Sequence, residues 1–126
     1  MNPQRILVVE DERLVARDIV MQLQELGFDA LGPVSTGEEA LEMAARERPD
    51  LVLMDIHLAS AMDGVAAAQT LRAQWGIPCI FLSAFGNAEQ LARAQLTEPV
   101  GYLEKPFGEY ELREVLAGAF QNAEKR

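Results

Sequence analysis

Five side chains that can do metal or phosphate chemistry each stand at the end of a short apolar run of the sequence. They are Glu10, Asp11, Asp55, Ser83 and Lys105. A carboxylate at the mouth of a buried run needs a partner or a cation, and three carboxylates held together repel one another unless a cation joins them. Mg²⁺ suits such a site, because it binds one or two carboxylates, keeps several waters and takes a substrate phosphate as a further ligand. The residue types therefore predict magnesium-assisted chemistry on a phosphate group.

The predicted ligands of this Mg²⁺ ion are oxygens. We expect Asp11 and Asp55 to supply carboxylate oxygens directly, and Glu10, one methylene longer than aspartate, to bind through a water. The backbone carbonyl of His57, two residues after Asp55, is within reach of the same ion. The His57 side chain has no histidine or cysteine near it in the sequence to complete a metal site, so we expect it to be exposed at the rim.

The phosphate would react at Asp55. With the metal in place, this carboxylate can attack phosphorus as a nucleophile and form an aspartyl phosphate. Lys105 would offer a point charge to the phosphoryl oxygens, and the Ser83 hydroxyl would donate a hydrogen bond to one of them. Glu12 is interpreted differently, because a carboxylate after a strand is often found at a helix start, where it complements the helix dipole.

Strands and helices in strict alternation must position these side chains. The short apolar runs predict strands over residues 6–9, 28–34, 51–54, 79–82 and 100–103. Apolar spacing and helix formers predict helices over residues 15–26, 38–48, 65–75, 87–96 and 112–120. This alternation is typical of an α/β fold with a parallel sheet covered on both faces. Ligands of such sheets bind beyond the carboxyl ends of the strands, which is where the five side chains stand.

The composition is that of one folded domain, and we expect a single domain over residues 1–126. Hydrophobic residues are 49% and charged residues 25%, and the net charge is −9. An acidic chain is a poor candidate for sequence-independent nucleic-acid binding or for binding anionic lipids. The one cysteine, Cys79, excludes an internal disulfide. Because we find neither a signal peptide nor a membrane span, we expect a cytoplasmic protein.

Five short motifs, in this order along the chain, resemble the receiver domain of two-component response regulators, of the chemotaxis-regulator-like kind. The motifs lie at residues 6–12 (ILVVEDE), 50–55 (DLVLMD), 63–64 (DG), 81–84 (FLSA) and 101–107 (GYLEKPF). The resemblance extends over the whole chain. Each motif is weak alone, but the five together at the expected strand ends are highly specific.

This resemblance implies a flavodoxin-like (βα)5 fold, a doubly wound parallel five-stranded sheet in the order 2-1-3-4-5. It implies that Asp55 accepts a phosphoryl group from a histidine kinase or a histidine phosphotransfer protein, with Mg²⁺ as cofactor. In the family, a hydroxyl residue and an aromatic residue on the fifth strand move together on phosphorylation, and these correspond to Ser83 and Tyr102. His57 and Phe85 correspond to positions that tune dephosphorylation, and we expect the bulky Phe85 to slow hydrolysis.

The sequence departs from the commonest family pattern in three places. Glu10 stands where aspartate is more frequent, and Ser83 stands where threonine is more frequent. The loop over residues 56–64 lacks the usual proline and looks one residue longer, which leaves its geometry open. The resemblance also suggests a cis peptide bond between Lys105 and Pro106, which would aim the lysine into the site.

Four functions are compatible with these residues to different degrees. The preferred one is a phosphorylatable signalling module that catalyses only its own phosphorylation and dephosphorylation and is otherwise not an enzyme. Its output surface, and a homodimer contact, would lie over residues 87–120, with an unknown downstream protein target and no direct binding of nucleic acid or membrane. The alternative is a pseudo-receiver that binds a partner without phosphorylation. An aspartate-nucleophile phosphatase is disfavoured because it needs a second aspartate where His57 stands, and a flavodoxin because acids occupy its phosphate loop.

Overall fold

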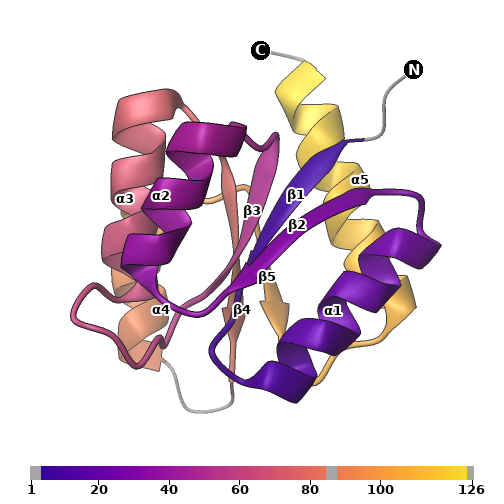
Figure 1. Cartoon of the computed structure of the whole chain (residues 1–126), viewed down its shortest axis with the longest axis horizontal. Helices are drawn as coiled ribbons and strands as arrows, with labels where there is room; N and C mark the ends of the chain where they lie inside the picture. The colour runs from indigo at the N-terminus through magenta and orange to yellow at the C-terminus, as the bar shows by residue number, and fades with distance from the viewer. Residues whose placement is uncertain (1–3, 85–87, 125–126) are drawn as a thin grey trace.

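The computed structural model describes residues 4–84 and 88–124, which form five strands and five helices in alternation (Figure 1). The strands are β1 (Arg5–Val9), β2 (Asp29–Val34), β3 (Leu51–Asp55), β4 (Cys79–Ser83) and β5 (Gly101–Glu104). The helices are α1 (Arg13–Glu25), α2 (Gly37–Glu47), α3 (Gly64–Trp75), α4 (Ala88–Gln95) and α5 (Glu109–Glu124). The predicted α/β fold is confirmed.

All five strands are parallel and lie in the order β2-β1-β3-β4-β5. This is the doubly wound order that the resemblance implied. The chain order reverses at β1, so the carboxyl ends of β1 and β3 open between helices that cover opposite faces. The sheet therefore offers a site at that edge without any extra element.

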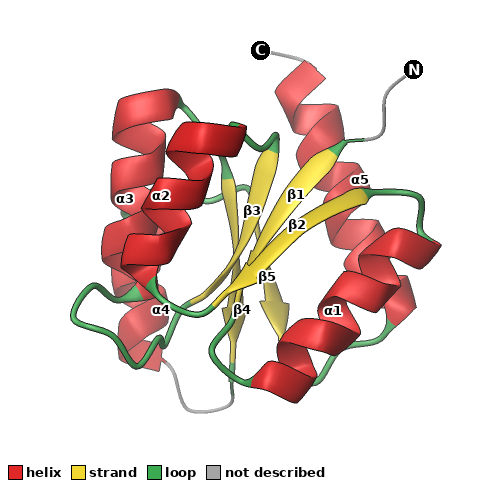
Figure 2. Ribbon diagram, viewed as in Figure 1, coloured by secondary structure: helices red, strands yellow, loops and turns green. Residues whose placement is uncertain are grey.

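Helices cover both faces of the sheet (Figure 2), and each layer has its own core. On one face, buried alanines of α2 and α3 belong to the same hydrophobic cluster as Met54 of β3 and Phe81 of β4. On the other face, Ile19 of α1 and Leu116 of α5 pack on the β-branched residues of β1. Burial of β1, β3 and β4 on both faces explains why the apolar runs of these three strands have no polar interruption.

The observed elements differ from the predicted ranges by a few residues at most of their ends. Asp55 and Ser83, expected just beyond their strands, are the last residues of β3 and β4. Helix α5 begins at Glu109 and ends at Glu124, so it is longer than the predicted helix because its polar ends carry no apolar stripe. Asn87, the predicted first residue of the fourth helix, lies outside the described residues.

Side-chain caps explain where two of the helices begin. Thr36 accepts a hydrogen bond from the Glu39 N–H (3.0 Å), and the Glu39 carboxylate accepts bonds from Ser35 and Thr36 in return, which forms a capping box. Asp63 caps α3 by accepting from the Ala66 N–H at 2.8 Å. Within the described part of the chain, no helix is long and apolar enough to span a membrane.

Candidate functional site

The five predicted side chains converge at the carboxyl edge of the sheet. Asp55 and Ser83 end the neighbouring strands β3 and β4, Glu10 and Asp11 directly follow β1, and Lys105 directly follows β5. The backbone N–H of Lys105 donates to the Ser83 carbonyl at 2.7 Å, which fixes the end of β5 against β4. The parallel pairing of the strands therefore brings together groups separated by up to ninety-five positions in sequence.

Three carboxylates at this edge form a set that fits a cation. Single oxygens of Glu10, Asp11 and Asp55 all lie within 4.8 Å of one another. Glu10 and Asp55 are buried, with exposed fractions of 2% and 3%, while Asp11 is half-buried. All three donors are hard carboxylate oxygens, the type that Mg²⁺ prefers. That the His57 carbonyl joins them stays a prediction.

Lys105 links two of these carboxylates. Its ammonium Nζ donates to Glu10 Oε1 at 2.8 Å and lies 3.5 Å from Asp55 Oδ2. The water-mediated contact of Glu10 with a metal stays a prediction. The structure adds a direct ion pair between Glu10 and Lys105, which the longer glutamate side chain can reach. The other Glu10 oxygen, Oε2, accepts from the Glu12 N–H at 3.1 Å, which holds the buried carboxylate in place.

Backbone N–H groups of the loop between β3 and α3 hold the other two aspartates. The N–H of His57 donates to Asp55 Oδ1 at 3.0 Å, and the N–H of Ala59 donates to Asp11 Oδ2 at 3.0 Å. Leu58 between them is buried and anchors the loop to the core. The loop without the usual proline is therefore tied to the site by its own backbone.

The electrostatics of the site oppose the ionisation of Asp55. Burial raises the pKa of Asp55 to about 7, and the Glu10 carboxylate adds to this, while the His57 N–H and the charge of Lys105 work against it. Burial alone would lower the pKa of the Lys105 amine, but its hydrogen bond to Glu10 and the charge of Asp55 outweigh burial and raise it. A cation at the site would relieve the repulsion between the carboxylates.

Asp55→Asn is expected to stabilise the protein at alkaline pH. In the unfolded chain Asp55 ionises near its ordinary pKa of 3.8, but in the folded protein near 7. Between these two pKa values, Asp55 is protonated in the folded protein and ionised in the unfolded chain. The stability of the wild type therefore falls as the pH rises from 4 to 7. The asparagine variant lacks this loss, and the gain is about 2 kcal/mol at pH 8, less than the full shift because the surrounding groups rearrange when Asp55 ionises.

Urea unfolding of both proteins at pH 8 and at pH 4, without divalent cations, measures this difference. The gain should disappear at pH 4, because Asp55 is then mostly protonated in the folded state and about half protonated in the unfolded chain. A gain that is the same at both pH values would contradict the electrostatic explanation.

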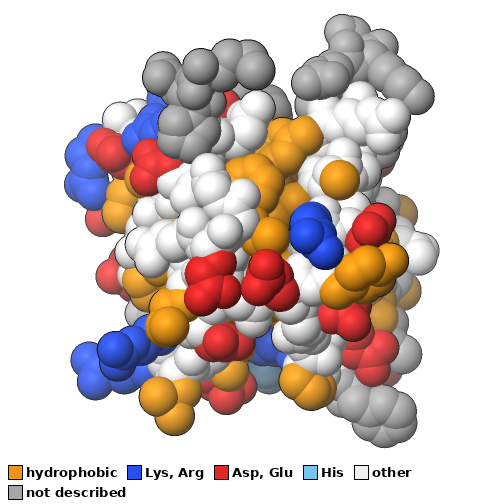
Figure 3. Space-filling view, turned by 90° about the vertical axis from the view of Figure 1, so that its right-hand side faces the viewer, with side chains coloured by type: hydrophobic (Ala, Val, Ile, Leu, Met, Phe, Trp, Pro, Cys, Tyr) orange, Lys and Arg blue, Asp and Glu red, His pale blue; other side chains and the backbone are white. Residues whose placement is uncertain are grey.

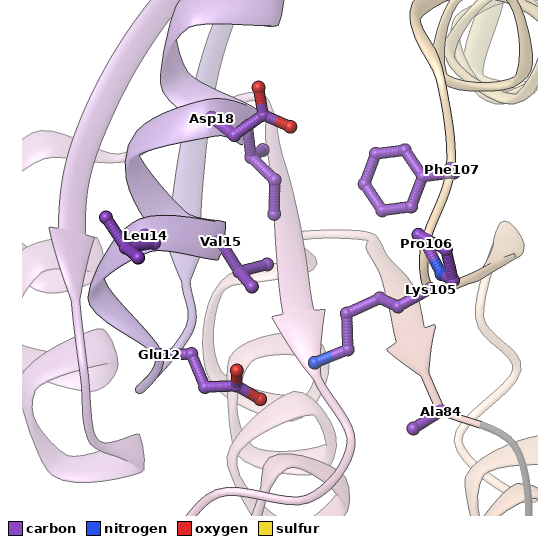
Figure 4. Close-up of a pocket in the computed structure, with 9 residues that line it drawn as sticks. Glu12, Leu14, Val15, Asp18, Ala84, Lys105, Pro106 and Phe107 are labelled. Atoms are coloured by element: carbon purple, nitrogen blue, oxygen red, sulfur yellow. The ribbon is translucent and has the colours of Figure 1, made fainter.

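The carboxylates open into a hollow at the protein surface. A cavity of about 320 Å³ is lined by Asp11, Glu12, Asp55, His57, Ala84 and Lys105. A second hollow of about 410 Å³ adjoins it and shares Glu12, Ala84 and Lys105 with it. In Figure 4, Lys105 extends across this second hollow toward Glu12, and Phe107 faces α1 from the opposite wall. A group brought by another molecule therefore has an open path to Asp55.

The wall of the second hollow is apolar and was not predicted from the sequence. Leu14 of α1 is 82% exposed, and Val15, Pro106 and Phe107 line the same hollow. The space-filling view of the side formed by α1 and α5 shows acidic and hydrophobic side chains next to one another (Figure 3). The sequence carried one sign of this apolar wall. Leu14 lies two residues after the acidic run, and the helical pattern places it away from the core.

The remaining predicted residues lie at or near the same edge. The His57 side chain is exposed, and Ser83 is buried at the end of β4. The Tyr102 ring is 38% exposed and stacks on Phe81, with ring centroids 6.3 Å apart. Phe85 lies outside the described residues, so its effect on hydrolysis stays a prediction. The peptide bond between Lys105 and Pro106 is cis, as the resemblance suggested, and so is that between Gly32 and Pro33.

Glu12 does more than begin a helix. It is the first residue before α1, but its side chain makes no capping hydrogen bond. Its carboxylate lines both hollows and contributes to the raised pKa of Lys105. Only the position of Lys105 at the end of β5, opposite the start of α1, reveals this role.

Comparison with known proteins agrees with this geometry. The family model of the response regulator receiver domain matches residues 6–117. The chain belongs to the response regulator receiver family. A receiver domain acts in two-component signalling, in which response regulators interact with histidine kinases and downstream targets.

Similar receivers occur in larger regulators. The transcriptional regulatory protein PdtaR of Mycobacterium tuberculosis is 36% identical over 105 residues, which are 83% of this chain and 51% of PdtaR. The phyllosphere-induced regulator PhyR of Methylorubrum extorquens is 33% identical over 124 residues, 96% of this chain and 46% of PhyR. The chain therefore spans about half the length of these curated relatives.

Solved receiver structures superpose closely on this chain. The signal receiver domain of a modulated diguanylate cyclase from Desulfovibrio desulfuricans is 39% identical with a TM-score of 0.90, and 95% of each chain is covered. The receiver domain of the Pseudomonas aeruginosa sensor histidine kinase PA1611 is 34% identical with a TM-score of 0.79, covering 90% of this chain and 94% of that one. That protein holds a magnesium ion in its active site cleft.

Proposed function

We propose that this receiver domain accepts a phosphoryl group on Asp55 from a phosphohistidine of a histidine kinase or a histidine phosphotransfer protein. The observation that carries the proposal is the ammonium of Lys105 placed 3.5 Å from Asp55 Oδ2 and 2.8 Å from Glu10 Oε1, at an open hollow. Asp55 is the one acid of the trio that ends a central strand of the sheet. The chemistry acts on Asp55 itself, and we propose no other substrate.

In the proposed reaction, a carboxylate oxygen of Asp55 attacks phosphorus. The bond between phosphorus and the donor imidazole nitrogen breaks, the imidazole leaves with the electron pair, and an acyl phosphate forms on Asp55. Glu10, Asp11 and Asp55 would hold Mg²⁺, which when bound offsets the negative charge of the carboxylates and the phosphoryl oxygens. Lys105 supplies a fixed positive charge to the same oxygens.

The protein's response to phosphorylation would involve the ends of β4 and β5. Ser83 stands at the end of β4, next to Asp55 on β3, and its hydroxyl can donate to a phosphoryl oxygen. Tyr102 pairs in register with Phe81, two residues before Ser83, so a shift of Ser83 has a direct route to the tyrosine. A half-exposed tyrosine at this position is suited to a two-state switch.

Incubation with acetyl phosphate and Mg²⁺ tests the proposal. The intact mass should increase by one phosphoryl group, and prior chelation of the metal by EDTA should abolish the increase, because the carboxylates then repel the incoming phosphate. If hydrolysis outruns detection, beryllofluoride should bind in the presence of Mg²⁺ and shift the amide resonances of Ser83 and Tyr102. A folded sample that gives neither response would contradict the proposal and favour a phosphorylation-independent binding module.

A further inference from the structure

The loop between β3 and α3 is attached to α2 by a serine hydroxyl. Residues 56–63 form neither helix nor strand, and Leu58 and Met62 join this loop to the core. Between them, Ser60 is half-buried, and its hydroxyl donates to the Met62 carbonyl at 2.6 Å. The same oxygen accepts from the N–H of Gly37, the first residue of α2, at 3.4 Å. In Figure 1 the loop lies at the same end of the molecule as the start of α2, and Ser60 links the two across twenty-three positions of sequence.

The start of α2 lies directly against the backbone of this loop. A Cβ atom added at Gly37 would lie 2.8 Å from the Met62 carbonyl oxygen and 2.9 Å from Met62 Cγ, so only glycine allows this close approach. The start of α2 is itself fixed, because Thr36 accepts from the Glu39 N–H in the capping box. Ser60 is therefore bonded to a fixed point of the fold rather than to a second loop.

Ser60 directly follows the residue that holds Asp11. The N–H of Ala59 donates to Asp11 Oδ2 at 3.0 Å. Asp11 lies in the bend between β1 and α1, whereas Asp55 belongs to β3, and the N–H of Glu10 donates to a carbonyl of β2 at 3.0 Å. Of the three carboxylates, Asp11 therefore depends most on the loop for its orientation.

We propose that Ser60 is a positioning residue for Asp11, and that it sets the affinity of the site for Mg²⁺. The residues that line the cavity at Asp55 do not include Ser60, so it acts through the Ala59 N–H. Hydrogen bonds to a ligating carboxylate orient it and raise metal affinity. Without the hydroxyl, the loop loses its bond to α2, and the Ala59 peptide gains freedom to leave Asp11. This role rests on the proposed function for its metal ion, but the bond between Ala59 and Asp11 is present without one.

Hydrogen exchange of the Ala59 amide tests the positioning without a metal. In the metal-free protein, the bond to Asp11 slows the exchange of this proton with water. Ser60→Ala should raise the exchange rate about fivefold, because the Ala59 N–H then leaves Asp11 more often. The amides of β3, which pairs with β1 and β4, should keep their rates. A general loss of stability would raise the exchange of those amides as well.

Titration of the full chain with Mg²⁺ tests the consequence for the metal. The amide resonances of Asp11 and Asp55 report binding, and the dissociation constant should rise about fivefold in Ser60→Ala. In adduct formation with acetyl phosphate, the Mg²⁺ concentration that gives half the maximal rate should rise by the same factor. The rate at saturating Mg²⁺ should stay within about twofold of wild type, because Asp55 and Lys105 are unchanged. This division separates a weakened metal site from a damaged acceptor.

Two matched variants show whether the Ser60 hydroxyl is the group that acts. Ser60→Thr keeps a hydroxyl and should retain the Ala59 exchange rate and the Mg²⁺ affinity of wild type within about twofold. Ser35→Ala removes a different hydroxyl next to α2, one that donates to the Glu39 carboxylate at 3.0 Å, and should leave both quantities unchanged.

The outcomes separate this role from the proposed function. Ser60→Ala with unchanged Ala59 exchange or unchanged Mg²⁺ affinity would overturn the proposal, and so would equal losses in Ser60→Thr or Ser35→Ala. A wild type that binds no Mg²⁺ would contradict the proposed function instead, and the Ala59 exchange rate alone would then decide whether Ser60 positions Asp11.

Discussion

Asp55→Asn is expected to abolish the phosphoryl adduct that the wild-type chain forms with acetyl phosphate and Mg²⁺. An amide oxygen is a far weaker nucleophile than a carboxylate, and the substitution also removes one of the three charges available to a cation. The fold should persist, because asparagine has nearly the same shape and can still accept the hydrogen bond from the His57 N–H. We expect the adduct to fall at least about a hundredfold, measured by intact mass after equal incubation.

The control for this experiment is Asp29→Asn. Asp29 is exposed at the first residue of β2, and the site lies at the opposite, carboxyl end of the strands. This variant changes the net charge by the same amount and should keep the wild-type adduct. An adduct of normal size on Asp55→Asn would place the acceptor on another residue, with Glu10 and Asp11 the first candidates because they share the cavity edge.

The meeting of the reactive side chains could be predicted from the sequence for a physical reason. Uninterrupted apolar runs require strands that are buried on both faces, and buried parallel strands must place their carboxyl ends at one edge. Asp55 and Lys105 are fifty residues apart in the chain, yet each stands at the carboxyl end of a predicted strand. The parallel pairing of β3, β4 and β5 brings both residues to that edge, where their charged groups lie 3.5 Å apart.

Contacts that depend on side-chain length and loop path could not be predicted. Nothing in the residue order says that Glu10 reaches Lys105 directly or that the N–H of Ala59 holds Asp11. The loop after Asp55 differs from the common family pattern, and only its three-dimensional path shows which backbone groups face the site. A hollow between β5 and α5, lined by Glu104 and Glu114, likewise depends on how α5 packs beside β5.

Gly64 shows how the same loop constrains the backbone beneath the acceptor. Gly64 is the first residue of α3 and follows the capping residue Asp63. A Cβ atom added at Gly64 would overlap the carbonyl oxygen of Asp55 and lie 3.1 Å from the Cα of Ile56. Both neighbours belong to the backbone, and the Ile56 N–H donates to the Leu82 carbonyl at 2.9 Å, so neither can move without disturbing β3 and β4. Glycine is therefore needed here for close approach, although its backbone dihedral angles are ordinary.

Gly64→Ala is accordingly expected to lower the free energy of unfolding by about 3 kcal/mol, at the upper end of what overpacking costs, because a backbone segment rather than a side chain must yield. Urea unfolding measures the loss, and Gly118→Ala is the matched control. Gly118 lies in α5, and a Cβ atom added there would meet no other atom within 4 Å, so alanine should stabilise the helix by about 0.5–1 kcal/mol. Since the displaced peptide carries Asp55, Gly64→Ala should also slow adduct formation at a temperature where the variant is folded. A variant as stable as wild type would show that α3 can shift away from Asp55 freely, and the loop would then not hold the acceptor in place.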